Sequence, residues 1–264
     1  MCMEDYSEIC RFVLARRVET GGFSASPTLA ASVQDTYYAL RILTSLPGLC
    51  QDELDSVMKD SCLESYLQHI DKNCQFSFKT IFQYLYSCSL LCMNLDERWS
   101  RRFFAERLMK TNTLADIYYC IRILREIYNS FVNVSEKDIR SFTKKWSTAE
   151  QLSMLLYINN GSCRGLSGSN EDLITWLQMC QTPDGGFGGM PGTTSFIEKC
   201  HSCLRALSLL NAAPLRPEKA RSFIMSCKTA DGGFARKNGG APFLDATWHA
   251  VASLNILRSY QLNN

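Results

Sequence analysis

The stretch that decides the fold runs from Gln181 to Leu210 and reads QTPDGGFGGMPGTTSFIEKCHSCLRALSLL. A glycine-rich turn, Asp184-Gly185-Gly186-Phe187, is followed by a short Gly/Pro loop and by an amphipathic segment that carries Cys and His. A near copy, KTADGGFARKNGGAPFLDATWHAVASLNIL, occupies 228–257, and a third Gly-Gly-Phe ends at Phe23. Because the same turn recurs before a similar segment, the sequence predicts a repeat architecture.

The rest of the chain alternates apolar and polar-faced segments with helical periodicity. The apolar segments are predicted at 34–46, 78–93, 115–127, 149–158, 197–210 and 246–257. The polar-faced segments are predicted at 6–16, 52–70, 95–110, 135–146, 171–180 and 216–227. We therefore expect an all-α protein in which apolar inner helices form a ring inside a sheath of outer helices. A closed ring would give the first and last repeats partners. No linker-like break divides 1–264, so a single domain is predicted.

Composition excludes several classes of function. The net charge of +2 does not indicate a nucleic-acid binder. No run approaches the ~18–20 apolar residues that a transmembrane helix needs. Many of the 13 cysteines lie inside apolar helical patterns, which is typical of buried, reduced thiols and predicts a cytoplasmic protein.

Four of the apolar segments align without gaps when they are anchored on Leu43, Leu124, Leu207 and Leu254. One face of the alignment then carries apolar and small residues, as a helix packed between neighbours needs. The other face carries the side chains Tyr37, Tyr38, Tyr118, Tyr119, His201 and Trp248. Two interpretations remain open for these residues. They form the packed core of the ring, or they wall a central cavity that binds a long apolar ligand or a carbocation. A repeated arginine (Arg41, Arg122, Arg205) is predicted to contact neighbouring helices rather than an anion.

The Asp-Gly-Gly-Phe turn, with an outer helix before it and an inner helix after it, resembles the squalene-cyclase and protein-prenyltransferase β-subunit superfamily. The resemblance is strongest over 171–258 and clear over 8–43. It implies an (α/α)6 toroid of about six helix pairs. It also implies a prenyltransferase β-subunit-like protein that acts on an isoprenoid, a prenyl diphosphate, inside the ring. Since the protein transferases of this superfamily work with a separate α subunit, an α-type protein partner is implied as well.

The same resemblance implies a zinc ion held by Glu198, Cys200 and His249, with Asp245 as an alternative acid. Zinc would keep a substrate thiol as the nucleophilic thiolate beside an allylic diphosphate. The sequence departs from the family pattern because Glu198 replaces an Asp, His249 stands one residue further from its Asp, and Met190 replaces a diphosphate-binding Arg. In the gapless alignment Cys200 falls at the place of Thr36 and Thr247, so a core role remains an alternative.

Two further hypotheses belong to other classes. The Asp-x-Asp-Asp motif of the cyclases in the superfamily that this chain resembles is absent. Three single acids, Asp35, Asp116 and Asp245, lie on the predicted inner helices. A terpene-cyclase-like enzyme could use one of them as a lone acid. The competing interpretation is that these acids start helices, where the helix dipole favours negative charge. A non-catalytic toroid that binds a lipid or a protein partner is the third hypothesis, and the missing diphosphate ligands favour it.

Overall fold

The computed structural model describes residues 3–46, 51–70, 76–94, 113–130, 141–163 and 165–262. The all-α prediction is confirmed, because this part of the chain holds helices and only isolated bridges outside them, with no strand. The predicted helix at 95–110 and the first residues of the one at 135–146 lie outside the described ranges. The helices are α1 (Met3–Leu14), α2 (Val33–Ser45), α3 (Gln51–Met58), α4 (Ser61–Gln68), α5 (Phe78–Leu90), α7 (Leu114–Arg122), a π-helical turn η1 (Ile123–Ile127), α9 (Ala149–Ile158), α10 (Asn170–Met179), α11 (Ile197–Leu209), α12 (Pro217–Ser226) and α13 (Leu244–Leu262).

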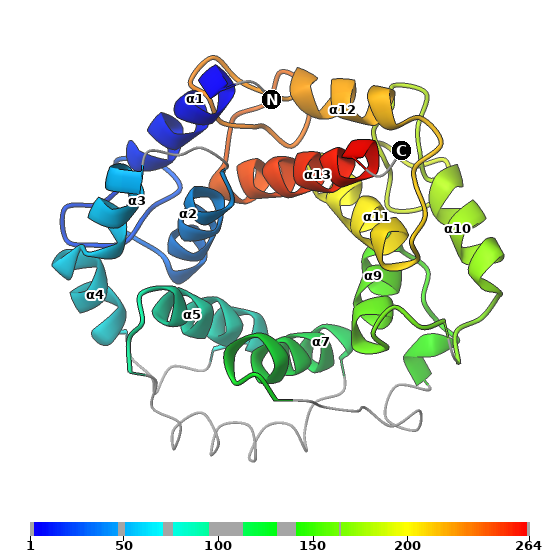
Figure 1. Cartoon of the computed structure of the whole chain (residues 1–264), viewed down its shortest axis with the longest axis horizontal. Coiled ribbons are helices and arrows are strands. Elements are labelled where there is room, and N and C mark those ends of the chain that lie inside the picture. The colour runs from blue at the N-terminus through cyan, green and yellow to red at the C-terminus, as the bar shows by residue number, and fades with distance from the viewer. Residues whose placement is uncertain are drawn as a thin grey trace. The chain divides into compact units, whose positions relative to one another are not determined.

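The helices form two compact units, 2–133 and 134–264. In the first unit α2, α5 and α7 are neighbours in one layer, and α1, α3 and α4 lie on the outer side of α2 and α5 (Figure 1). In the second unit α11 packs between α9 and α13, while α10 covers α11 and α12 covers α13 (Figure 1). The predicted alternation of inner and outer helices is present in each unit. The six-repeat count, the closed ring and the single domain stay predictions.

The predicted outer helix at 52–70 is wrong in one respect, because it is two helices, α3 and α4, with a break at Lys59–Asp60. Asp60 accepts a hydrogen bond from the backbone N–H of Cys62 and so caps the N-terminus of α4. The same carboxylate pairs with Arg17, at 2.5 Å, beside the first glycine turn. These two contacts of Asp60 stabilise the start of α4, and so they favour a break in the chain over an extension of α3.

Each of the two units has phenylalanine side chains in its core. Phe12, Phe23, Phe82, Phe187 and Phe234 are all fully buried, and three of these belong to the glycine turns. The cysteines of the described residues are free thiols, and most of them are buried. Among the helices of the described ranges, none is long and apolar enough to cross a membrane.

Candidate functional site

The glycine turns fix where the inner helices begin. Gly185 has a φ of +95°, and a Cβ there would lie 2.3 Å from the carbonyl oxygen of Lys219 on α12. Gly21 in the first turn has a φ of +99° and meets the carbonyl oxygen of Cys62 on α4 in the same way, at 2.0 Å. In both of these turns, glycine is therefore needed at this position for two reasons: the left-handed backbone conformation and the close approach of the next outer helix.

The phenylalanine that ends each turn is tied to the following inner helix by one hydrogen bond. The N–H of Phe23 donates to the Thr36 hydroxyl at 3.0 Å, and the N–H of Phe234 donates to the Thr247 hydroxyl at 2.9 Å. In the middle repeat the N–H of Phe187 donates to the Cys200 sulfur at 3.3 Å. The structure thus confirms the gapless alignment, and Cys200 does in its repeat what a threonine does in the other two.

Cys200 has the environment of a core thiol. The side chain is fully buried in α11. Burial raises the pKa of this thiol, because it penalises the charged form, and the single bond from the Phe187 N–H opposes the rise only in part. Without a metal ion, the neutral thiol is therefore the stable form of this side chain.

The other two predicted zinc ligands face different partners. Glu198 lies in the first turn of α11, and its Oε2 is buried with no hydrogen-bond partner. His249 lies on α13, where its Nδ1 is 2.8 Å from the Nδ1 of His201. Among the described residues no group of three His, Cys, Asp or Glu side chains could hold a metal ion. Zinc binding by Glu198, Cys200 and His249 stays a prediction that metal analysis must test.

The three candidate acids lie in the first turns of helices and make contacts that are typical of this position. Asp35 accepts a bond of 2.6 Å from the hydroxyl of Ser32, the N-cap of α2. Asp116 accepts one of 2.7 Å from the hydroxyl of Thr113, the N-cap of α7. Asp245, in the first turn of α13, forms an ion pair of 3.0 Å with Arg236. All three carboxylates therefore make the hydrogen-bond or ion-pair contacts of acids at a helix start.

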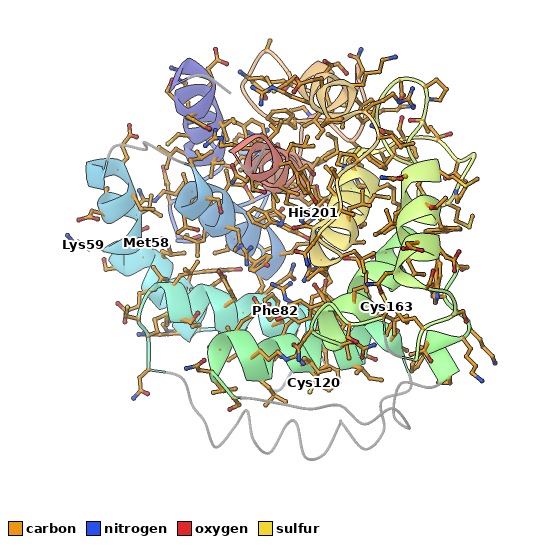
Figure 2. The ribbon with its side chains drawn as sticks, turned by 45° about the vertical axis from the view of Figure 1, so that its right-hand side comes forward. Met58, Lys59, Phe82, Cys120, Cys163 and His201 are labelled. Carbon is orange, nitrogen blue, oxygen red and sulfur yellow. The ribbon has the colours of Figure 1, made fainter. Side chains whose placement is uncertain are left out.

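The predicted aromatic residues fall into two groups, one in each unit. The four tyrosines of α2 and α7 come together through Phe82 of α5 (Phe82 is labelled in Figure 2). The Phe82 ring centroid lies 5.7 Å from that of Tyr37 and 5.8 Å from that of Tyr119. Tyr38 contacts Tyr37 at 5.2 Å, and Tyr118 contacts Tyr119 at 5.0 Å. We call these rings, with Tyr86 of α5, the aromatic array.

Two arginines cap the aromatic array. The Arg122 guanidinium lies 3.9 Å from the centroid of the Phe82 ring and is held by a bidentate bond to Glu126 in η1. The Arg41 guanidinium lies 4.8 Å from the Tyr86 ring. Such contacts are favourable because the ring face attracts cations. The prediction that these arginines contact neighbouring helices is confirmed, since both rings belong to α5.

Phe82 and Tyr86 are members of the array that the alignment missed. Their helix, α5, was predicted as an apolar element, but it was not among the four helices of the alignment. The aromatic residues at spacing i, i+4 within it were the available signal, because this spacing places both rings on one face.

His201 and Trp248 form the second group, on α11 and α13. Their ring centroids are 6.3 Å apart, and His201 is also in ring contact with His249, at 5.0 Å. The loop that precedes α11 has an exposed Met190 where the family pattern has Arg, and Lys199 in the first turn pairs with Glu150 of α9 at 3.4 Å.

Comparison with known proteins identifies the family. No curated protein matches the chain. The family described as "Prenyltransferase alpha-alpha toroid domain" matches residues 1–100, 79–219 and 171–264, and these matches together cover the whole chain. The turns, the paired helices and this match agree. The chain belongs to the prenyltransferase alpha-alpha toroid domain family.

Proposed function

We propose that this protein binds an isoprenoid, a prenyl diphosphate, as a prenyltransferase β-subunit-like protein. The observation that carries the proposal is the aromatic array, in which rings from α2, α5 and α7 touch in one continuous series. A prenyl chain is a long apolar ligand, and aromatic faces bury such a chain and attract the allylic cation that forms when diphosphate leaves. The family match across the chain supports the same substrate class.

Two arginines next to the aromatic array could bind the anionic diphosphate head of the ligand. A prenyl diphosphate joins an apolar tail to an anionic head, so its binding needs cations at the edge of an apolar surface. Arg41 and Arg122 would supply these cations next to the aromatic array, where they stack on Tyr86 and Phe82. Because Glu126 neutralises much of the charge of Arg122, diphosphate binding would compete with that ion pair.

The transferase form of the proposal is a zinc-dependent enzyme that uses Glu198, Cys200 and His249, together with an α-type protein partner. Bound zinc would hold the thiol of the substrate as a nucleophilic thiolate. For this chain to provide the ligands, the Cys200 thiol would have to leave the Phe187 N–H and lose its proton. His249 would have to leave His201.

A second candidate, a non-catalytic toroid that binds a lipid or a protein partner, is favoured by one specific observation. Cys200 is the threonine-equivalent residue of its repeat, so a complete explanation for its presence exists without chemistry. The second candidate differs from the first because it binds a lipid or a protein without turnover. A lone-acid cyclase is the third candidate, and its acids Asp35, Asp116 and Asp245 have the capping and ion-pair contacts given above.

The test is equilibrium binding of prenyl diphosphates of increasing chain length to the full chain, with and without added Zn²⁺. Tyr86→Leu and Tyr119→Leu alter half-buried members of the array and should each weaken binding, by about 1 kcal/mol per lost aromatic contact. Tyr157→Leu is the matched control, because Tyr157 is also stacked by an arginine, Arg205 at 4.9 Å, but belongs to the other unit. If no prenyl diphosphate binds, or if all three variants bind alike, the proposal is overturned.

A further inference from the structure

The chain contains two Asn-Gly pairs, Asn160-Gly161 and Asn238-Gly239, and the function proposed above uses neither. In such a pair the backbone nitrogen of the glycine can attack the side-chain amide of the asparagine, because glycine has no side chain that blocks the approach. The reaction needs an accessible asparagine and a glycine N–H that is free of a hydrogen bond. The two pairs differ in how well they meet these requirements.

Asn238 and Gly239 are both exposed, in the loop that joins α12 to α13 (Figure 1). The Gly240 N–H donates to the Lys237 carbonyl at 3.1 Å, and Gly239 has a φ of +76°, as a type II turn requires at its third residue. None of the described residues accepts a hydrogen bond from the Gly239 N–H. A Cβ added at Gly239 would meet nothing within 4 Å, so the space around the pair is open.

Asn160 is exposed as well, but the glycine that follows it is held in place. The Gly161 N–H donates to the Leu156 carbonyl at 2.7 Å, just after the end of α9. A Cβ at Gly161 would lie 2.8 Å from the Leu209 carbonyl oxygen, so this backbone packs against the end of α11. Attack by the Gly161 nitrogen would therefore require a local opening of the structure first.

The turn that holds Asn238 does not itself require asparagine. The fourth residue after the phenylalanine of the glycine turn is, in the three repeats, Pro27, Pro191 and Asn238. In the first repeat the Leu29 N–H closes a four-residue turn on the Ser26 carbonyl at 3.0 Å. In the middle repeat the Thr193 N–H closes one on the Met190 carbonyl at 3.2 Å. Proline suits the second place of such turns because its φ is fixed. The last repeat therefore carries a reactive amide in a turn that the other two build without one.

We propose that Asn238 is a site of spontaneous deamidation and that Asn160 in the folded chain is not. The Gly239 nitrogen gives up its proton and forms a bond to the Cγ of Asn238. The bond between Cγ and Nδ2 breaks, and the departing nitrogen takes up a proton and leaves as ammonia. Water then opens the cyclic imide at either carbonyl, which leaves aspartate or isoaspartate at position 238. No oxidant or reductant is involved, and the site is independent of whether the aromatic array binds an isoprenoid.

The product changes the charge of the loop that precedes α13. Arg236 and Lys237 are the cations of 235–243, and both are exposed. Arg236 pairs with Asp245, in the first turn of α13, at 3.0 Å. A new carboxylate at position 238 would offset part of this positive charge and compete with Asp245 for the guanidinium. Deamidation would therefore weaken the ion pair that ties this loop to α13.

The experiment follows both pairs in one sample of the full, unaltered chain. The protein is incubated at mildly alkaline pH in water labelled with heavy oxygen, then digested in ordinary water and analysed by mass spectrometry. The label marks only residues that were hydrolysed during the incubation. Asn238 should convert at least about tenfold faster than Asn160, which corresponds to a difference of about 1.4 kcal/mol in local opening. In denaturant, where neither glycine is held, the two pairs should convert at similar rates.

Two glycine variants provide a matched comparison. Gly239→Ala should slow the conversion of Asn238, because the added methyl group hinders the attack. Gly192→Ala should leave it unchanged, although Gly192 stands at the same place in the middle repeat, with a φ of +79° and nothing within 4 Å of its Cβ. The inference is overturned if Asn160 converts as fast as Asn238 in the folded chain. It is also overturned if Asn238 stays intact in the folded chain while it converts in denaturant.

Discussion

The substitution Cys200→Thr tests whether Cys200 is structural. The change puts into the middle repeat the residue that the other two repeats have at the same place. In the last repeat the Thr247 hydroxyl accepts from the Phe234 N–H at 2.9 Å and donates to the Phe243 carbonyl at 2.8 Å. The equivalent carbonyl of Phe196 already accepts the backbone N–H of residue 200 at 2.9 Å, so a hydroxyl there would find both partners.

The magnitude follows from comparing two isosteric changes. Cys200→Thr should leave the free energy of unfolding unchanged or raise it, by at most about 1 kcal/mol, because a neutral hydrogen bond contributes about that amount. Cys200→Val keeps a similar volume but leaves the Phe187 N–H buried without an acceptor, which costs about 1–3 kcal/mol. The gap between the two variants isolates the hydrogen bond from the packing.

Chemical denaturation of both variants measures this gap, and thermal melts should separate them by about 2–4 °C per kcal/mol. Thr247→Val is the internal control and should cost about as much as Cys200→Val, since it removes the same bond in the last repeat. The reasoning is refuted if Cys200→Val is as stable as Cys200→Thr, or if Cys200→Thr loses as much stability as Cys200→Val.

Three further predictions concern the turns and the helix starts. Gly185→Ala should lower the free energy of unfolding more than Gly192→Ala, as measured by denaturant melts. Both glycines have positive φ, which costs about 1–2 kcal/mol for alanine, but only at Gly185 would the added Cβ collide with backbone atoms. Equal losses in the two variants would contradict this explanation. Burial alone would raise the pKa of Asp184, but hydrogen bonds from Ser195, Thr182 and the Gly186 N–H outweigh it and lower the pKa. The ionised carboxylate therefore stabilises the fold above the unfolded pKa of about 3.9, and this stabilisation is lost as the pH falls through the lower folded value. Asp184→Asn should flatten the decline of the denaturation midpoint on acidification, and an unchanged decline would contradict the assignment. Asp116→Asn should cost α7 about 0.3–1 kcal/mol of dipole stabilisation and leave any turnover of a polyprene unchanged, so an abolished activity would restore the lone-acid cyclase.

The repeat register was predictable because each turn demands the same residues. Glycine is required at position 185 because of its positive φ and because the Lys219 backbone lies close to it. Another residue at this position would therefore disrupt the turn. The residue that receives the phenylalanine N–H needs only a small side chain with an acceptor, which Thr36, Cys200 and Thr247 all provide. The sequence alignment could therefore find the structural equivalence of Cys200 and also its competing interpretation as a metal ligand.

The side-chain partners were not predictable in the same way. His201 aligns with Trp248, yet its Nδ1 contacts His249, one residue further along α13. Such an offset depends on side-chain rotamers and on the packing of α11 against α13, which periodicity does not encode. Phe82 likewise was absent from the predicted site, although it joins the tyrosines of α2 to those of α7, because the alignment used four inner helices and α5 was not one of them.

The most direct test of the proposed function maps where an isoprenoid contacts the chain. A prenyl diphosphate with a photoactivatable group on its tail would be bound to the full chain, irradiated, and the labelled peptides identified by mass spectrometry. The account predicts saturable labelling on α2, α5 and α7, at the aromatic array, which unlabelled prenyl diphosphate competes away. Labelling confined to other helices, or labelling that unlabelled ligand does not reduce, would contradict it.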